Sequence, residues 1–293
     1  MKKRTIIGID IGGTKICAGR VVDGIVEKSS RYNIPVVSDI DAQAVVDEVK
    51  RAIKDVYIDN VEGIGVGVPS VLDRQTGEIY DVQNIKSWDR INLKDILEEE
   101  FDIPVYIDND ANCFTLGEKI YGEGKHYNSF VGITIGTGIG GGIINNGTLL
   151  DDANCGSGEF GMVPYLDGVL EDYCSGQFFK NKIKQDGFNV FQKALSGDKD
   201  AIQAYKDYGK HLGNAIKVIM YTVDPKVIII GGSIISAKEL FEETMWQSIN
   251  SFAYKISPKK ITIKYTDIDG DAQILGASAV YIDRSYQESM KKV

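Results

Sequence analysis

The sequence predicts an α/β fold in two domains. Strand patterns alternate with amphipathic helix patterns along the 293 residues, and this alternation is typical of α/β proteins. A strand, a glycine-rich turn and a second strand in residues 5–22 recur in residues 130–145, where IGIDIGGT and VGITIGTG align without gaps. Such a repeat indicates a duplicated unit, so we expect a duplicated fold with a ligand between the two copies.

The first half of the chain is expected to open with three antiparallel strands. Residues 5–11 and 16–22 are apolar runs joined by a glycine turn, and Asp23-Gly24 is a hairpin signal before a third strand. The remaining elements expected in this half are helices over 41–57, 92–101 and from 108–112 through 121, and buried strands over 62–68 and 104–107.

The second half is expected to mix strands and helices. The strands are expected over 130–135, 142–145, 226–230 and 261–265, and the helices over 199–223 and 273–286, with a hairpin at Asn146-Gly147 and a glycine loop over 136–142. We place an N-terminal α/β domain at residues 1–115, completed by the C-terminal helix at about 273–293. The C-terminal α/β domain then comprises residues 116–272.

Composition narrows the classes of partner. The net charge is −9 and no basic stripe occurs, so nucleic acid is not an expected partner. No apolar run is long enough to span a membrane, and no secretory signal is visible. The four cysteines, Cys17, Cys113, Cys155 and Cys174, form no CxxC pair, so we expect a reduced, cytoplasmic protein.

The first motif is the turn Asp10-Ile11-Gly12-Gly13-Thr14-Lys15. Two glycines at a strand end allow the backbone to approach an anion, while Thr14 adds a hydroxyl donor and Lys15 a positive charge. Asp10 could hold Mg²⁺ through water. The alternative is a plain hairpin turn in which Asp10 is a local cap. No GxxxxGK[ST] sequence is present, which excludes a P-loop.

The second motif is the loop that begins Gly136-Thr137-Gly138. Its sequence also satisfies GxGxxG, but a dinucleotide-binding loop should open a helix. This loop instead runs into Ile143-Ile144 and a hairpin signal. We interpret it as a second phosphate-binding loop, and NAD(H) binding would revive the dehydrogenase alternative.

The third motif, Asp108-Asn109-Asp110, follows a buried strand. Polar groups there are costly unless they bind a ligand or cap a helix. Asp110 could serve as a general base and Asn109 as a hydroxyl ligand, or Asp110 could cap the next helix. An unperturbed aspartate has a pKa of about 4, so we expect Asp110 to be ionised at neutral pH.

Together these motifs resemble the ROK (repressor, open reading frame, kinase) family of sugar kinases over nearly the whole chain. The segments that carry the resemblance are DxGGTK, GxGxP at 65–69, the Asn84/Trp88 neighbourhood, DNDAN, GTGxGGG and a late glycine pair at Gly231-Gly232. The resemblance implies a two-domain actin-like ATPase/sugar-kinase (ribonuclease H-like) fold with an interdomain cleft.

The resemblance also implies roles for individual residues. Asp110 would be the catalytic base, and Asp10 would support Mg²⁺. The implied sugar hydroxyl ligands are Asn84, Asn109, Asp110, Glu159 and Glu171. The implied ATP-binding residues are Asp10, Gly12, Gly13, Thr14, Lys15, Gly136, Thr137 and Gly138, with Gly231 and Gly232 near the adenosine.

The implied activity is ATP-dependent phosphorylation of a hexose, with glucose at its 6-hydroxyl as the first expectation. N-acetylmannosamine or N-acetylglucosamine is the alternative substrate. Homodimers are common in the family. Many members read E-x-G-H before a Cys-rich zinc segment, whereas this chain has Met162 at the histidine position and lacks that segment. We therefore expect no zinc site, and the rival from another class is a sugar-binding sensor without catalysis.

Overall fold

The computed structural model describes residues 4–34, 41–80, 82, 85, 88, 90–152 and 156–291. Its contacts divide the chain into two compact units. Unit 1 comprises Met1–Asn128, Ile144–Ser157 and Asp267–Val293, and unit 2 comprises Ser129–Ile143 and Gly158–Thr266. The domains expected from the sequence, 1–115 with 273–293 and 116–272, differ from these units and stay a prediction. Helix α3 (Asp110–Ile120), which runs through residue 115, lies wholly in unit 1.

The first sheet has the strand order β3-β2-β1-β4-β8. Its strands are β1 (Thr5–Ile11), β2 (Lys15–Val22), β3 (Ile25–Asn33), β4 (Gly63–Val68) and β8 (Val105–Asn109). The first three are antiparallel, as predicted, while β4 and β8 run parallel to β1. Asp23 and Gly24 turn the hairpin with φ angles of 49° and 84°, which is the positive-φ geometry that such turns require.

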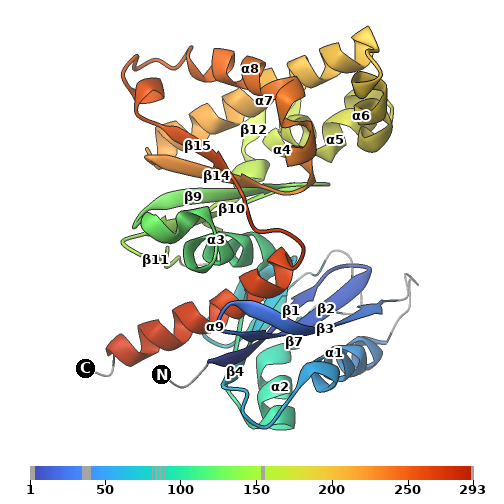
Figure 1. Cartoon of the computed structure of the whole chain (residues 1–293), viewed down its shortest axis with the longest axis vertical. Coiled ribbons are helices and arrows are strands. Elements are labelled where there is room, and N and C mark those ends of the chain that lie inside the picture. The colour runs from blue at the N-terminus through green and yellow to red at the C-terminus, as the bar shows by residue number, and fades with distance from the viewer. Residues whose placement is uncertain are drawn as a thin grey trace. The chain divides into compact units, whose positions relative to one another are not determined.

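Helices cover both faces of this sheet, as Figure 1 shows. These helices are α1 (Ala42–Val56), α2 (Leu93–Phe101), α3 and α9 (Ala272–Lys291). Unit 1 also has a short turn at Glu123–His126 and a small antiparallel sheet of β5 (Val71–Asp73), β6 (Glu78–Tyr80) and β7 (Arg90–Asn92). Two strand glycines bring α9 close to the sheet. A Cβ atom at Gly8 would lie 2.0 Å from the Ile274 carbonyl oxygen, and one at Gly65 would lie 1.9 Å from that of Ala277.

The second sheet has the order β11-β10-β9-β14-β15. Its strands are β9 (Phe130–Ile135), β10 (Ile139–Asn145), β11 (Thr148–Leu149), β14 (Val227–Gly231) and β15 (Thr262–Tyr265). Strands β9, β14 and β15 are parallel, so this sheet repeats the order of the first, with a hairpin on one side of the leading strand and two parallel strands on the other. This topology confirms the duplication that the sequence repeat predicts.

One expected strand boundary in this sheet is wrong. The glycine run was expected to be a loop through residue 142, but β10 already begins at Ile139. Gly141 gives the reason, because a Cβ atom there would lie 2.7 Å from the Gly158 carbonyl oxygen and 2.8 Å from the Phe160 ring. The glycines leave room for a neighbouring segment without ending the strand.

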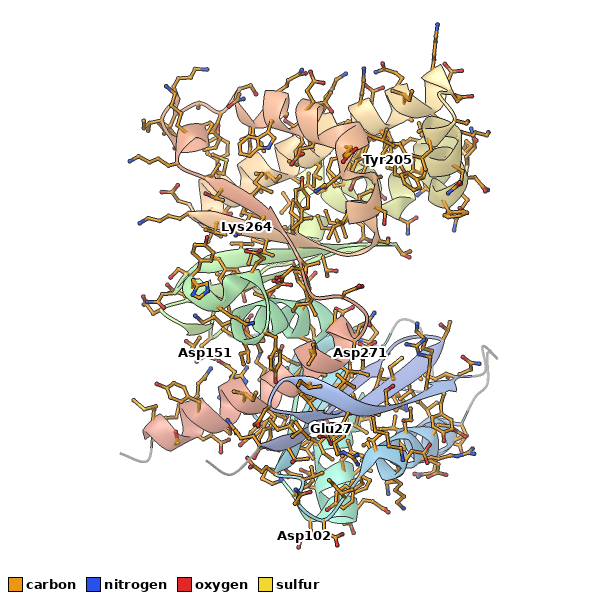
Figure 2. The ribbon with its side chains drawn as sticks, viewed as in Figure 1. Glu27, Asp102, Asp151, Tyr205, Lys264 and Asp271 are labelled. Atoms are coloured by element: carbon orange, nitrogen blue, oxygen red, sulfur yellow. The ribbon has the colours of Figure 1, made fainter. Side chains whose placement is uncertain are left out.

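The helices of unit 2 are more numerous than the sequence predicts, and the expected helix over 199–223 is present as α7 (Lys199–Thr222). They are α4 (Leu170–Cys174), α5 (Gly176–Phe178), a π-helical turn (Phe179–Ile183), α6 (Gly187–Leu195), α7 (Lys199–Thr222) and α8 (Lys238–Ile249), with short turns at Phe160–Met162, Ser233–Ala237 and Ser257–Lys259 and a hairpin of β12 (Pro164–Tyr165) and β13 (Gly168–Val169). Helices α7 and α8 lie together in Figure 1. Tyr205 of α7, labelled in Figure 2, is buried in this helical layer.

Two further expectations concern cysteines and membranes. Cys17, Cys113 and Cys174 are buried free thiols, and Cys155 lies outside the residues that the structure covers. Within the covered ranges, no helix has both the length and the apolar character of a membrane span.

Candidate functional site

Three parallel strands of unit 1 place carboxylates at one edge of the first sheet. Asp10 of β1 pairs with Gly67 of β4, and Gly67 pairs with Asp108 of β8. Because the carboxyl ends of parallel strands meet at one edge, the chain that follows β8 brings Asp110 close to Asp10. A Cβ atom at Gly67 would lie 3.6 Å from Asp10 Oδ1 and 3.0 Å from Cys113 Sγ, so this glycine keeps space open beside Asp10.

The surrounding protein raises the pKa of both carboxylates. Burial is the first cause that raises the pKa of Asp10 to about 6, the charge of Asp110 is the second, and Lys15 opposes both. Burial also raises the pKa of Asp110, against the backbone N–H groups of Ala111 and Asp110 itself. Asp110 is nevertheless exposed to solvent. The expectation of an unperturbed Asp110 is therefore corrected, because the surrounding protein disfavours its ionised form.

Helix capping separates the roles of Asn109 and Asp110. The Asn109 side-chain oxygen accepts a hydrogen bond from the Asn112 N–H at 2.7 Å, so Asn109 is the N-cap of α3. Asp110 is the first residue of the helix. The alternative that Asp110 is the N-cap is therefore wrong.

A buried network of ion pairs stabilises the carboxyl end of β8. Asp108 is fully buried, and its Oδ2 atom lies 3.0 Å from Arg74 Nε and 3.2 Å from Arg284 Nη2. Its Oδ1 atom accepts a hydrogen bond from the Asn112 side-chain amide at 2.7 Å. Two guanidinium groups and an amide thus satisfy a charge that would otherwise be costly to bury.

The same network extends to the end of a second segment of unit 1. Arg74 Nη1 lies 2.7 Å from Asp152 Oδ1, and Asp152 Oδ2 accepts a hydrogen bond from the Ser157 N–H at 3.0 Å. The sequence analysis missed Arg74, Arg284 and Asp152, because nothing local in their segments signals a buried ion pair.

The glycine turn after β1 is closed by its own backbone. The Gly12 N–H donates to the Lys15 carbonyl at 2.8 Å, and the Ile34 N–H donates to the Thr14 carbonyl at 2.8 Å. Gly13 lies in the same turn. The side chains of Thr14 and Lys15 are exposed, so a hydroxyl and an ammonium group are presented at the surface of the turn.

The second glycine loop lies in unit 2, between β9 and β10. Its Gly136 N–H donates to the Gly138 carbonyl at 2.9 Å. Strand β14, parallel to β9, ends at Gly231, and Gly232 follows with φ at +90°. A Cβ atom at Gly232 would lie 2.1 Å from the Ile135 carbonyl oxygen, so only glycine allows this turn to lie against the end of β9.

These two turns form one wall of a cavity of about 680 Å³ in unit 2. Gly136 and Thr137 line it from the loop, and Ser233 and Ile234 line it from the turn after Gly232. Of the residues assigned to the nucleotide in this unit, Gly136 and Thr137 line the cavity, while Gly231 and Gly232 precede the turn that lines it. A volume of this size is typical of small-molecule sites.

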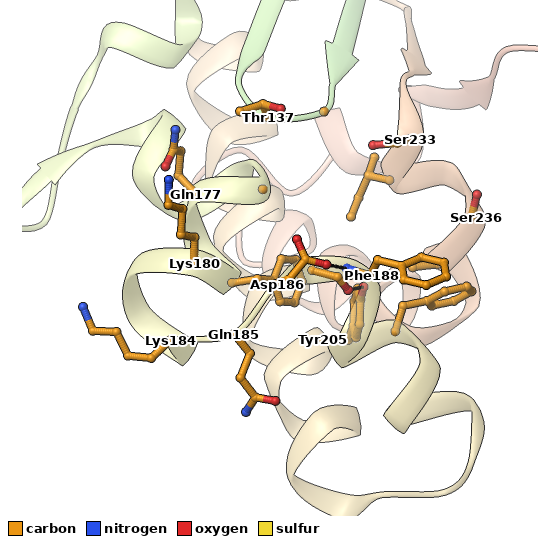
Figure 3. Close-up of a pocket in the computed structure, with 17 residues that line it drawn as sticks. Thr137, Gln177, Lys180, Lys184, Gln185, Asp186, Phe188, Tyr205, Ser233 and Ser236 are labelled. Carbon is orange, nitrogen blue, oxygen red and sulfur yellow. Dashed lines mark hydrogen bonds between the residues drawn. The ribbon is translucent and has the colours of Figure 1, made fainter.

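The opposite wall of the cavity comes from the helical part of unit 2. Phe188 and Tyr205 supply aromatic surface, and Lys180 supplies a positive charge. Figure 3 shows the Asp186 carboxylate near the middle of the view, whereas Lys184 points away. The Asp186 carboxylate also accepts a hydrogen bond from the Phe188 N–H at 3.0 Å, which caps α6.

The two candidate glutamates differ in their surroundings. Glu159 is exposed and precedes the short turn that contains Met162, which is also exposed. Glu171 is half-buried in the first turn of α4, and its Oε2 atom accepts a hydrogen bond from the Ile139 N–H at 3.0 Å. Asn84 lies outside the residues that the structure describes.

A divalent cation can be tested against these residues. Mg²⁺ is commonly held by one or two carboxylates together with water and phosphate oxygens. Asp10 fits that role, because burial and Asp110 already disfavour its negative charge, which a cation would stabilise. Within the described ranges, no group of three or more His, Cys, Asp or Glu side chains is arranged to hold a metal ion.

Comparison with known proteins identifies the family of the chain. The sequence model of the ROK family matches residues 6–284. The chain belongs to the ROK family. A glucokinase from Thermotoga maritima is 27% identical over 319 residues, which cover 97% of this chain and 99% of that protein.

Solved structures of the ROK family confirm the predicted α/β fold class. A ROK family glucokinase from Streptomyces griseus, in complex with glucose and AMPPNP, matches with a TM-score of 0.79 and 25% identity over 96% of this chain and 99% of that one. A proposed N-acetylmannosamine kinase from Listeria monocytogenes matches with a TM-score of 0.79 and 28% identity over 97% and 99% of the respective chains.

Proposed function

We propose that this ROK family protein is an ATP-dependent hexose kinase that phosphorylates glucose at its 6-hydroxyl, in the cytoplasm. The observation that carries the proposal is the pair Asp10 and Asp110, in which an exposed carboxylate stands at the start of α3 beside a more buried one. Membership of the ROK family and similarity to glucokinases support the assignment.

Asp110 is the general base in this proposal. It accepts the proton of the sugar hydroxyl while the hydroxyl oxygen bonds to the γ-phosphorus of ATP. The bond from that phosphorus to the β–γ bridging oxygen breaks, which releases ADP. A base with a raised pKa holds the transferred proton more strongly than an ordinary aspartate does, and general-base catalysis is most efficient when that pKa approaches the working pH.

The nucleotide is assigned to both glycine turns. The turn at Gly12, Gly13, Thr14 and Lys15 offers a hydroxyl and an ammonium group to phosphate oxygens. The cavity lined by Gly136 and Thr137 has aromatic and polar walls of a size that suits a nucleoside. Gly231 and Gly232 shape this cavity through the turn that leads to Ser233.

Mg²⁺ is the implied metal cofactor, and Asp10 is the residue assigned to it, through water. When bound, Mg²⁺ offsets the negative charge of the phosphates and so favours attack by the hydroxyl oxygen. The charge of Lys15 partly opposes the rise in the pKa of Asp10 and so favours its ionised form.

The sugar is assigned to Asn109, Asp110, Glu159 and Glu171, with Asn84 as a further predicted ligand. Glucose is favoured over N-acetylmannosamine or N-acetylglucosamine because two glucokinases are among the similar proteins. N-acetylmannosamine remains the second candidate, since the Listeria protein is proposed to use it. Met162 cannot offer the strong hydrogen bond of a histidine, and this difference can redirect specificity toward another sugar.

An ADP-release assay over glucose, fructose, mannose, N-acetylmannosamine and N-acetylglucosamine tests the proposal. We expect Mg²⁺- and ATP-dependent turnover that is highest with glucose. Highest turnover with an N-acetyl sugar would make that sugar, and not glucose, the proposed substrate. Sugar binding without turnover of any of the five would favour a sensor. The zinc content of the same sample tests the expected absence of zinc, and its oligomeric state shows whether the protein forms the homodimer that is common in the family.

A further inference from the structure

Helix α4 is attached to the second glycine loop by a set of hydrogen bonds within unit 2. The Ser175 hydroxyl lies 2.9 Å from the Thr137 carbonyl oxygen. The Gly176 N–H donates to the Gly136 carbonyl at 2.7 Å. The Ile139 N–H donates to Glu171 Oε2 at 3.0 Å. The Glu171 carboxylate, the Ser175 hydroxyl and the Gly176 N–H therefore hold the loop by hydrogen bonds, from Gly136 to Ile139.

Ser175 is placed where its single proton has two competing acceptors. The side chain is fully buried at the junction of α4 and α5. Its Oγ atom lies 2.9 Å from the Thr137 carbonyl oxygen of the loop and 2.7 Å from the Glu171 carbonyl oxygen of α4. A hydroxyl donates one hydrogen, so the Thr137 and Glu171 carbonyl oxygens compete for it.

Glu171 fills the space that a side chain at Gly138 would need. A Cβ atom at Gly138 would lie 2.5 Å from Glu171 Oε2. A Cβ atom at Gly176 would likewise lie 3.0 Å from the Gly136 carbonyl oxygen. The loop therefore packs in direct contact with the start of α4 and the start of α5.

We propose that Ser175 and Glu171 are positioning residues that set the conformation of the Gly136–Gly138 loop, so that nucleotide affinity depends on what the Glu171 carboxylate contacts. This inference rests on the proposed function, which assigns nucleotide phosphates to the loop and sugar to Glu171. A sugar hydroxyl at Glu171 changes the hydrogen bonding of the carboxylate that holds Ile139. Sugar and nucleotide then influence each other's affinity reciprocally, as two linked ligands must.

Nucleotide binding in Ser175→Ala is the first test. Titration with the non-hydrolysable nucleotide AMPPNP, without sugar, should show binding about three- to tenfold weaker than in the wild type, since one hydrogen bond to the loop is lost. Ser278→Ala is the matched control, because Ser278 is also fully buried and donates to a helix carbonyl, that of Leu275, in unit 1. The control should lose stability without losing affinity for AMPPNP.

Two variants of Glu171 separate positioning from sugar contact. In Glu171→Gln an acceptor oxygen remains for the Ile139 N–H, whereas in Glu171→Ala none does. Both should raise the KM for the sugar that the assay identifies. Only Glu171→Ala should also raise the KM for ATP, again about three- to tenfold, and a purely structural role would not divide the two KM values in this way.

The coupling itself is measured as the ratio of AMPPNP dissociation constants without and with saturating sugar. We expect a ratio of at least about five in the wild type, and a ratio near one in Ser175→Ala. A wild type that turns over sugar while Ser175→Ala and Glu171→Ala keep its nucleotide affinity and KM would overturn this inference and leave the proposed function intact. Weakened AMPPNP binding in Ser175→Ala, with no turnover of any sugar by the wild type, would instead overturn the proposed kinase function and the coupling to sugar, and would leave only the positioning role of Ser175.

Discussion

The Asp110 carboxylate lies close enough to Asp10 for its negative charge to be the second cause, after burial, that raises the pKa of Asp10 to about 6. The two residues come from different segments, the end of β1 and the start of α3. The charge of Asp110 disfavours the ionised form of Asp10, so protons and cations bind readily at Asp10. The arrangement of the two aspartates leads directly to two predictions.

Asp110→Asn should fold normally and lose turnover by about 10²- to 10⁴-fold, because the amide cannot accept the proton of the sugar hydroxyl. Asn is nearly isosteric with Asp, and Asn109 rather than Asp110 caps α3, so the helix should keep its start. Turnover in the ADP-release assay is the measurement, with the melting temperature as a check on folding. A variant with near-wild-type turnover would remove Asp110 from the role of base.

Asp10→Asn should stabilise the folded protein at neutral pH and should not do so in acid. The pKa of Asp10 is raised from 3.8 in an unfolded chain to about 6 in the folded protein, so the folded state binds the proton more tightly. The wild type therefore loses stability as the pH rises from about 4 to about 6, and Asn, which has no charge, does not.

The gain in Asp10→Asn at pH 7 should be about 1–3 kcal/mol, the upper limit being the full shift in pKa. Urea unfolding in the absence of Mg²⁺, at pH 4 and at pH 7, measures it. An equal difference between variant and wild type at both pH values would show that Asp10 is not held in an unfavourable ionised form. The same variant should lose Mg²⁺-dependent turnover if Asp10 supports the metal.

Local patterns explain why most elements of the fold could be predicted from the sequence. The hairpin at Asp23-Gly24 needs only its own turn chemistry, and α1 needs only its apolar spacing and the cap at Asp41. The ion pair of Asp108 with Arg284 joins residues 176 positions apart, and no local pattern reports it. The contact between Glu171 and Ile139 depends in the same way on how α4 packs against the loop.

Packing also explains where a correct pattern gave a wrong boundary. The glycines of 138–142 are typical of a loop by composition, yet β10 runs through most of them. Gly141 has no side chain because Phe160 and Gly158 occupy the space beside it, and not because the chain turns there. For the candidate site, Asp10, Asp110 and Glu171 could be chosen as candidate residues from the sequence motifs. The raised pKa of the two aspartates could not, since burial is its main cause.

Arg74→Met should destabilise the protein by about 3 kcal/mol, because it leaves the fully buried Asp108 with Arg284 as its remaining ion-pair partner among the described residues. Arg90→Met is the matched control. The Arg90 side chain is 71% exposed and forms an ion pair with Glu78, and such a surface pair contributes little to stability. Chemical denaturation of the three proteins measures the effect. Equal losses in both variants would mean that the Asp108 network is not a principal support of this strand end.

Gly232→Ala should weaken nucleotide binding as well as stability. Gly232 has a φ of +90°, and an added Cβ atom would lie 2.1 Å from the Ile135 carbonyl oxygen, so the turn would have to move away from β9 and deform the cavity lined by Ser233. Gly147 is the control with a similar φ, since its φ is +91° and a Cβ atom there would contact nothing within 4 Å. Gly147→Ala should therefore cost about 1 kcal/mol of backbone strain and leave the KM for ATP unchanged. Gly232→Ala should cost more and raise that KM at least about tenfold, since the turn forms one wall of the site.

Steady-state kinetics and melting temperatures of the two variants, measured together, test this prediction. Similar KM values for ATP would mean that the turn after β14 does not shape the nucleotide site.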